Sequence, residues 1–293
     1  MLQASELLHD FGGRGPTIHL AHANGFPPGT YRQLADVLAD TYHVIGLPAR
    51  PLWPGSDPAK APDWRPLAKD LVQALHDLSL SGIVGVGHSL GGVLTLWAGS
   101  NQPGLFRAVI LIEPVILPPT WLFYLRLMRW LGLGKRQPLV QSALRRRRAW
   151  SSHEECFVHF RQKPFFGRWS DDALWDYVKS GTCRREDHPV ALRYPPEWEA
   201  HIFATAPADI WRDVPRLRVP ALVLRGEHSR TFLPSAQARL TRLLPQARSV
   251  TIPDSGHLVP MERPSETARL ILEFLAQLDR RRIQRYNVAE EGR

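Results

Sequence analysis

The chain has 293 residues, which is enough for one large domain with an insertion or for two smaller domains. Hydrophobic residues make up 44% of it, and 37 Lys and Arg against 28 Asp and Glu give a net charge of +9. No run of about 20 apolar residues is present, so no transmembrane helix is expected. Residues 1–15 lack the apolar core of a secretory signal peptide, and Cys156 and Cys183 are too few for a disulfide framework. We therefore expect a cytoplasmic protein with two reduced thiols.

Short apolar runs and amphipathic segments alternate in the first part of the chain. Strands are predicted at residues 17–21, 43–47, 83–86 and 107–112, and helices at about 31–39, 66–81 and 90–101. Continuous apolar runs are typical of strands that are buried on both faces of a parallel sheet. The alternation of strands and helices predicts an α/β fold with a doubly wound, mostly parallel sheet.

A long segment interrupts this alternation before it resumes. Residues 115–207 contain aromatic-rich helical stretches at 121–131 and 171–178. Beyond them, strands are predicted at 221–225 and 249–252, helices at 235–244 and 265–278, and a frayed charged tail at 279–293. We therefore predict a core formed by residues 1–114 and 208–293, with residues 115–207 inserted as a helical cap. These inserted residues are called the cap segment below.

A Gly-x-Ser-x-Gly pattern carries the strongest chemical signal. It reads Gly87-His88-Ser89-Leu90-Gly91 and stands between a predicted buried strand and a predicted helix. A serine on such a sharp turn needs small neighbours, and the turn lifts its hydroxyl clear of the sheet. The start of the following helix then points at the reacting carbonyl and stabilises negative charge there. The pattern predicts Ser89 as a nucleophile.

With this turn, the chain resembles the α/β-hydrolase family over about residues 17–278, and in particular serine carboxylesterases and lipases with a helical cap. The stretch His22-Ala23-Asn24-Gly25-Phe26-Pro27 resembles the family's oxyanion loop. The resemblance implies that the backbone N–H groups of Leu90 and Phe26 form the oxyanion hole. A shift of the alignment by one or two residues would move the second role to Asn24 or Gly25.

The resemblance also implies a histidine base late in the chain. Asp254-Ser255-Gly256-His257 resembles the family's catalytic-histidine loop and follows the last predicted strand. A neutral imidazole there can take the serine proton and later deliver it to the leaving group. Two other histidines, His88 and His22, are expected to have structural roles.

The third catalytic residue departs from the common pattern of the family. The acid usually follows the strand at 221–225, but Ser229 and Arg230 occupy its place. Two carboxylates remain as candidates. Glu113 ends the strand after the nucleophile helix, another location known in the family, whereas Glu227 stands very near its strand end. We favour Glu113, because a carboxylate buried at a strand end needs a partner and His257 is the obvious one.

Aromatic residues crowd the start of the cap segment. We predict that Trp121, Phe123 and Tyr124, together with Trp97 in the core, line a hydrophobic substrate pocket, although packing within the cap or core explains them equally well. Between Ile116 and Thr205 the chain has 15 Lys and Arg against 9 Asp and Glu. We read this charge as a solvated face of the cap, with no nucleic-acid partner, and we keep contact with an anionic membrane surface as a less favoured alternative.

These features predict a serine hydrolase that cleaves carboxylic esters of small hydrophobic substrates through an acyl-enzyme on Ser89. A serine nucleophile argues against the dehalogenases and epoxide hydrolases of this fold, which use Asp. No metal-ligand cluster and no nucleotide-binding loop is evident, so no metal and no cofactor is expected. Two alternatives stay open: hydrolysis of a carbon–carbon bond, and a binding or receptor protein on a hydrolase scaffold without turnover.

Overall fold

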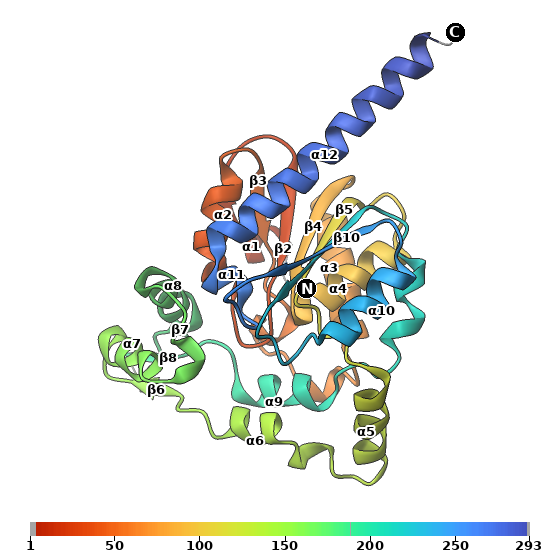
Figure 1. Cartoon of the computed structure of the whole chain (residues 1–293). Helices are drawn as coiled ribbons and strands as arrows, with labels where there is room; N and C mark the ends of the chain where they lie inside the picture. Colours follow the sequence, from red (N-terminus) through yellow and green to blue (C-terminus); the bar gives the residue numbers. More distant parts are fainter. Residues whose placement is uncertain (1–3, 188, 292–293) are drawn as a thin grey trace.

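A seven-stranded sheet organises the computed structural model, which describes residues 4–187 and 189–291 (Figure 1). Its strand order is β1-β3-β2-β4-β5-β9-β10, and only β1 runs antiparallel to its neighbour. The strands are β1 (His9–Gly12), β2 (Thr17–Ala21), β3 (His43–Gly46), β4 (Ile83–His88), β5 (Phe106–Ile112), β9 (Ala221–Gly226) and β10 (Ala247–Ile252). The doubly wound, mostly parallel sheet is therefore confirmed, and β1 is an edge strand that the sequence did not reveal.

Helices cover both faces of this sheet. They are α1 (Ala4–Leu7), α2 (Arg32–Ala39), α3 (Arg65–Asp77), α4 (Leu90–Asn101), α10 (Pro234–Leu243), α11 (Val259–Glu262) and α12 (Pro264–Glu291). Apolar residues of α2 and α12 pack on one face, and those of α3, α4 and α10 on the other. Successive residues of β5 point to opposite faces of the sheet. Ala108 and Ile110 pack on the face covered by α2 and α12, and Val109 and Leu111 pack on the other face. Two-sided burial explains the continuous apolar runs.

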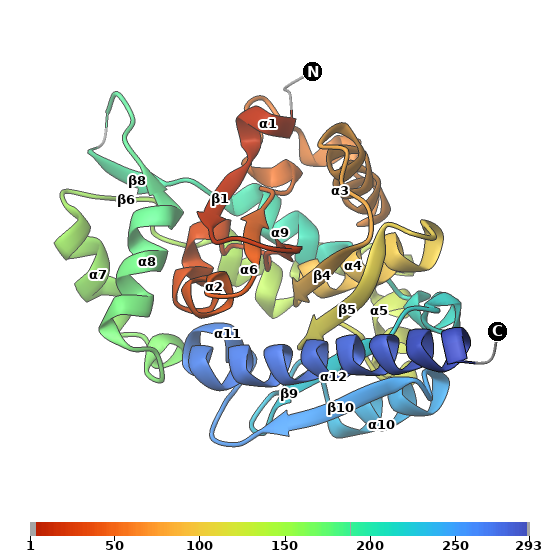
Figure 2. The same ribbon diagram turned by 90° about the horizontal axis from the view of Figure 1, so that it is seen from above.

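Helix α12 is much longer than the sequence pattern predicted. The helix was expected to end near Leu278, followed by a frayed tail, but it continues to Glu291. No Gly or Pro stands between Leu278 and Gly292, so nothing in the sequence stops the helix. Figure 2 shows α12 crossing the molecule beside β9 and β10. Among the described residues, no helix is long and apolar enough to cross a membrane.

The cap segment lies between β5 and β9 and is not purely helical. It contains α5 (Pro119–Trp130), α6 (Pro138–Leu144), α7 (His153–Arg161), α8 (Asp171–Gly181) and α9 (Pro196–Ala204). It also contains a small antiparallel sheet in the order β6-β8-β7, formed by β6 (Ala149–Trp150), β8 (Val190–Leu192) and β7 (Thr182–Cys183). The insertion is mostly helical, and the sequence did not reveal its three short strands, because strands of two or three residues are too short to show a period.

The turn between β4 and α4 is tightly packed. Ser89 adopts φ 56° and ψ −113°, a conformation that side chains rarely accept. The two glycines of the pattern allow this turn, because a Cβ on Gly91 would lie 2.1 Å from the carbonyl oxygen of Ala21 and one on Gly87 would lie 2.3 Å from that of Gly91. These are backbone atoms, which have no room to move aside.

We predict that Gly91→Ala lowers the free energy of unfolding by about 2 kcal/mol or more, because the new methyl group overlaps the backbone of β2. Urea denaturation measures this change. The matched control is Gly134→Ala, since the nearest atom to a Cβ there is a side-chain carbon 3.7 Å away. Equal stability of Gly91→Ala and the native protein would show that the turn has more room than this packing indicates.

Three histidines are buried near the carboxyl ends of β2 and β4. His19 lies on β2, His22 follows it and His88 ends β4, and none is more than 2% exposed. Burial removes the hydration that an imidazolium needs, so the pKa of His19 is lowered to about 3, that of His22 to about 4 and that of His88 to about 3. The folded protein therefore holds all three in the neutral form at pH 7.

We predict that the free energy of unfolding falls as the pH decreases from about 6.5 towards 4. The unfolded chain takes up protons at the ordinary histidine pKa, whereas the folded chain does not, so each group costs about 1.4 kcal/mol per pH unit in this window. Above pH 6.5 the histidines are neutral in both states, so this loss of stability is absent. His19→Leu should flatten the dependence by about one such increment, because it removes one titrating group. It breaks no hydrogen bond within the described residues, since neither ring nitrogen of His19 has a partner there.

Urea denaturation at pH 7, 6 and 5 tests this expectation. The matched control is Ile18→Val, a change at a buried residue of the same strand that removes no titratable group, so it should leave the pH dependence as in the native protein. If His19→Leu keeps the native slope, His19 does not contribute to the acid sensitivity.

Candidate active site

Ser89 stands at the carboxyl edge of the sheet, between β4 and α4. Its backbone N–H donates to the carbonyl oxygen of Ile112, 3.0 Å away, which ties the turn to the end of β5. The residue is 6% exposed. The strained turn therefore holds the hydroxyl at the point where the parallel strands β4 and β5 end, the usual place for ligands in such sheets.

His257 reaches Ser89 from the loop between β10 and α11. Its Nε2 lies 2.9 Å from Oγ of Ser89. Two contacts hold this loop: the N–H of Gly256 donates to Glu262, at 2.6 Å, and His88 Nε2 lies 2.9 Å from the carbonyl oxygen of His257. The structure thus brings together the two residues that the sequence predicted as nucleophile and base.

Glu113 completes a continuous chain of hydrogen-bonding groups. Its Oε2 lies 2.9 Å from Nδ1 of His257, and its side chain is fully buried. The same carboxylate accepts the N–H of Gly226, at 2.6 Å, and the hydroxyl of Ser229. Its backbone has φ 48° and its N–H donates to Leu224, 2.8 Å away, so the end of β5 turns towards β9. A buried carboxylate with this many donors is well satisfied.

Glu227, the second candidate, points elsewhere. Its side chain is 51% exposed, and it accepts the backbone N–H of Asp254 at 3.1 Å. Ser229, which occupies the usual position of the acid, donates its hydroxyl to Glu113 instead. The carboxylate that contacts His257 therefore comes from the end of β5, and Ser229, after β9, donates a hydrogen bond to it.

Leu90 and Phe26 differ in how free their N–H groups are. Leu90 is the first residue of α4, and its N–H has no acceptor in the part of the chain that the structure describes. The N–H of Phe26 instead donates to the carbonyl oxygen of Ala23 at 3.2 Å, within a turn. The expectation that Phe26 supplies an oxyanion-hole donor therefore does not fit, because that N–H is already engaged.

Asn24 is one of the two alternatives that the sequence left open, and its N–H has no acceptor among residues 4–187 and 189–291. The cap segment holds its side chain from both sides. Nδ2 donates to the carbonyl oxygen of Glu199, at 3.1 Å, and Oδ1 accepts the hydroxyl of Tyr194, at 2.8 Å. Tyr194 and Glu199 were missed at the sequence level, because nothing in a sequence links positions 170 or more residues apart.

A pair of buried charges lies over the same loop. Arg146 forms a salt bridge with Glu199 and donates to the hydroxyl of Tyr177, 2.6 Å away. A Cβ on Gly25 would lie 3.2 Å from Oε1 of Glu199, so this pair packs directly against the oxyanion loop. The ring of Phe26 packs beside Tyr177, with 5.3 Å between the ring centroids. The positive charge of the cap segment, which we expected to be solvated, is therefore partly turned inward at Arg146.

His88 and His22 have structural roles, as the sequence suggested. The hydroxyl of Tyr31 accepts the N–H of Ala23 at 2.8 Å and lies 2.7 Å from Nδ1 of His88. The hydroxyl proton therefore goes to Nδ1, and the opposite nitrogen of His88 donates to the carbonyl oxygen of His257. This relay joins the oxyanion loop to the histidine loop. His22 lies 2.8 Å from the carbonyl oxygen of Ala23 and accepts the N–H of Ala49.

The four predicted pocket residues do not line an enclosed pocket. Trp97 is buried in the core, where its indole N–H donates to Asp213 at 2.8 Å. Trp121, Phe123 and Tyr124 lie on α5 with about half or more of each residue exposed. Their expected role as a substrate wall is therefore not supported. The aromatic pattern could not distinguish an inward face from an outward one, because most residues of α5 are apolar.

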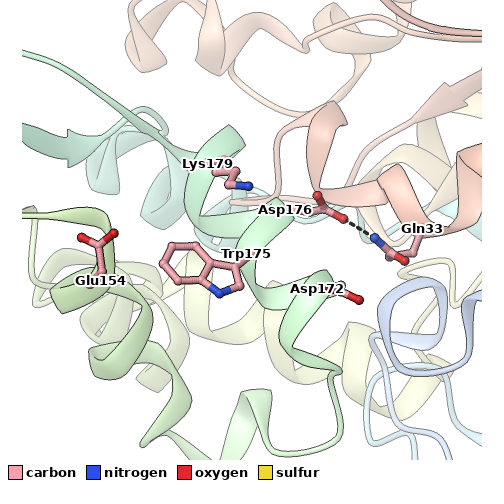
Figure 3. A pocket seen from close by; sticks show the side chains of 6 residues that line it. All are labelled: Gln33, Glu154, Asp172, Trp175, Asp176 and Lys179. Atoms are coloured by element: carbon pink, nitrogen blue, oxygen red, sulfur yellow. Dashed lines mark hydrogen bonds between the residues drawn. The ribbon is translucent and has the colours of Figure 1, made fainter.

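Two other surface features contain groups that could bind a ligand. A surface hollow of about 380 Å³ lies between α2, α7 and α8, lined by Gln33, Glu154, Asp172, Trp175, Asp176 and Lys179 (Figure 3). It includes no nucleophile with an adjacent base. Among the described residues, Glu227, His228 and Asp254 are a group whose ligand atoms lie within 4.8 Å of one another, but all three are exposed. Neither feature competes with the Ser89–His257–Glu113 arrangement.

Comparisons with known proteins agree with this fold. An uncharacterized hydrolase of Bacillus subtilis (strain 168) is 25% identical over 262 residues, 84% of this chain and 85% of that one. A pimeloyl-[acyl-carrier protein] methyl ester esterase of Xanthomonas axonopodis pv. citri (strain 306) is 24% identical over 271 residues, 92% and 98% of the two chains. The crystal structure of E-2-(acetamidomethylene)succinate hydrolase superposes with a TM-score of 0.73 at 20% identity and covers 92% of this chain and 94% of that one.

The model of the alpha/beta hydrolase family matches residues 20–270, a range that includes the oxyanion loop, the serine turn, Glu113 and His257. The protein is therefore a hydrolase-fold protein whose relatives include named hydrolases and an esterase, and the chain belongs to the alpha/beta hydrolase family.

Proposed function

We propose that the protein is a serine hydrolase that cleaves carboxylic esters through an acyl-enzyme on Ser89. One observation carries the proposal: the unbroken line from Ser89 Oγ to His257 Nε2, and from His257 Nδ1 to Glu113 Oε2, each step 2.9 Å long. This is the relation that nucleophilic acyl transfer needs, with the base in reach of the nucleophile and a third group orienting the base.

The proposed reaction follows from these positions. The Ser89 hydroxyl attacks the ester carbonyl and passes its proton to Nε2 of His257. Glu113 holds the Nδ1–H tautomer and stabilises the imidazolium that forms. The tetrahedral intermediate then collapses, and His257 returns the proton to the departing alkoxide, so an alcohol leaves. A water molecule that is activated by the same histidine attacks the acyl-enzyme and releases the carboxylic acid.

For the oxyanion we propose the N–H groups of Leu90 and Asn24. Both belong to segments that approach Ser89, and both lack an acceptor within the described residues. Each donor should lower the barrier by about 3 to 4 kcal/mol. The start of α4 adds the positive end of its dipole at the same place. The contacts of Asn24 with Tyr194 and Glu199 make the position of this donor depend on the cap segment.

The esterase relative favours ester cleavage over other acyl transfers. A carbon–carbon bond hydrolase remains a second candidate, since the buried cation of Arg146 lies beside the oxyanion loop, where an acidic substrate group would need one. Glu199 neutralises this cation, however, so esters lead. The third alternative, a binding protein without turnover, is the least supported, because nothing in the Ser89–His257–Glu113 geometry is missing. The cytoplasmic location and the absence of a cofactor stay predictions.

We predict that the native protein hydrolyses p-nitrophenyl esters and that Ser89→Ala lowers this activity by a factor of about 10⁴ or more, since it removes the atom that forms the acyl-enzyme. The assay uses p-nitrophenyl esters of increasing acyl chain length, and the dependence of the rate on chain length indicates the size of the acyl pocket. A fold control by circular dichroism accompanies each variant. Activity that persists in Ser89→Ala would disprove the nucleophile. No activity of the native protein on any ester would favour carbon–carbon hydrolysis or ligand binding.

We predict that Glu113→Gln lowers kcat by about 10³- to 10⁴-fold, because the amide cannot stabilise the imidazolium and can select the wrong tautomer. The matched control is Glu227→Gln, an equivalent change at an exposed carboxylate that makes no contact with His257. Its kcat should stay close to the native value. The reverse ranking of the two variants would move the catalytic acid to the loop after β9.

A further inference from the structure

Helix α5 presents an apolar side to the outside of the molecule. Its exposed residues, with the one that follows the helix, are 40% to 81% exposed: Trp121, Phe123, Tyr124, Leu127, Trp130 and Leu131. Only Leu122 and Leu125 are buried. A surface helix normally buries its apolar stripe and exposes its charges. Here six large apolar side chains face outward over three turns, which a helix in contact with water alone does not favour.

The two arginines of the helix are used to fasten it. Arg126 donates to the carbonyl oxygen of Ala208, at 2.6 Å, and Arg129 donates to Ala204, at 3.0 Å, and to Ala206. The charged groups therefore anchor α5 to the end of the cap segment. This fixes the orientation of the helix, so its apolar side is held outward by specific contacts.

Helix α6 follows α5 in the cap segment and also exposes apolar side chains. Leu139 and Leu144 are exposed on α6. Figure 1 shows α5 and α6 along one edge of the molecule, at the end opposite the C-terminus of α12. We call the exposed apolar residues of α5 and α6, with Leu131, the α5–α6 face.

The charge of this part of the chain has one sign. Residues 115–150 contain eight Lys and Arg and no Asp or Glu, and three of the eight form ion pairs with glutamates elsewhere in the chain: Arg146, Arg147 and Arg148. Arg136 and Arg145 are exposed, and within the described residues neither has an acidic partner. The α5–α6 face therefore combines aromatic and leucine side chains with an excess of positive charge at its border.

We propose that the α5–α6 face docks the protein on the surface of a bilayer that contains anionic phospholipids. Trp and Tyr are suited to the boundary between headgroups and acyl chains, because one end of each ring is apolar and the other is polar. Exposed Lys and Arg near such a face are attracted to anionic headgroups. The attachment is peripheral, with α5 lying in the interface.

The charge also selects this occupant over a second copy of the chain. Two copies that met through the α5–α6 face would bring the exposed Arg136 and Arg145 of both copies together, and neither side chain has an acidic partner within the described residues. A protruding helix with outward side chains also needs no complementary groove in a fluid bilayer. The partner that fits both the charge and the shape is therefore an anionic lipid surface.

Vesicle flotation with the full chain tests the proposal. The native protein should float with vesicles of phosphatidylcholine and phosphatidylglycerol and much less with phosphatidylcholine alone, and added salt should weaken the binding. Leu127→Ser/Trp130→Ser should weaken binding to the anionic vesicles about tenfold or more, because it removes two apolar contacts. Arg136→Gln/Arg145→Gln should reduce mainly the preference for anionic vesicles.

The matched control is Ile283→Ser on α12, an equally exposed apolar residue at the opposite end of the molecule, and it should bind like the native protein. Circular dichroism shows whether each variant is folded. Flotation measures binding directly, so the test does not depend on any enzymatic activity. Failure of the native protein to bind anionic vesicles overturns the proposal, as does equal binding by Leu127→Ser/Trp130→Ser. Concentration-dependent dimers that the same double variant abolishes would assign the face to a second copy and also overturn it.

Discussion

The buried carboxylate of Glu113 is the constraint around which the site is built. A charge without exposure to water is stable only when donors surround it, and this one has three: Gly226, Ser229 and His257. Each donor comes from the far end of the chain, so the carboxylate joins the end of β5 to the loops after β9 and β10. The same contacts that satisfy the charge also orient His257 towards Ser89.

This arrangement explains why the usual acid position can hold a serine. The loop after β9 has no carboxylate at position 229, but the hydroxyl there donates to the carboxylate from the neighbouring strand. Because β5 and β9 are adjacent and parallel, their carboxyl ends lie at the same edge of the sheet. A carboxylate at either strand end can therefore reach one histidine, so the same contact can be made from a different chain position.

The cap segment influences both the reactive centre and the molecular surface. On its inner side, Tyr194 and Glu199 hold the side chain of Asn24, and Arg146 packs over Gly25. On its outer side, α5 exposes aromatic residues. The inner contacts are hydrogen bonds and an ion pair at the loop of residues 22–27, whereas the outer side chains are apolar and exposed. The cap segment thus has a polar inner side, which contacts residues 22–27, and an apolar outer side on α5.

The sequence by itself determined the sheet, the serine turn and the order of the main strands and helices, because two-sided burial and the steric limits of the turn leave local patterns. It also indicated Ser89, His257 and Glu113 as candidates. Only the tertiary structure decided that Glu113, and not Glu227, faces His257, that Phe26 is engaged in a turn, and that α5 faces outward. These facts depend on contacts between residues far apart in the chain and on which side of a helix is covered, and local periodicity carries neither.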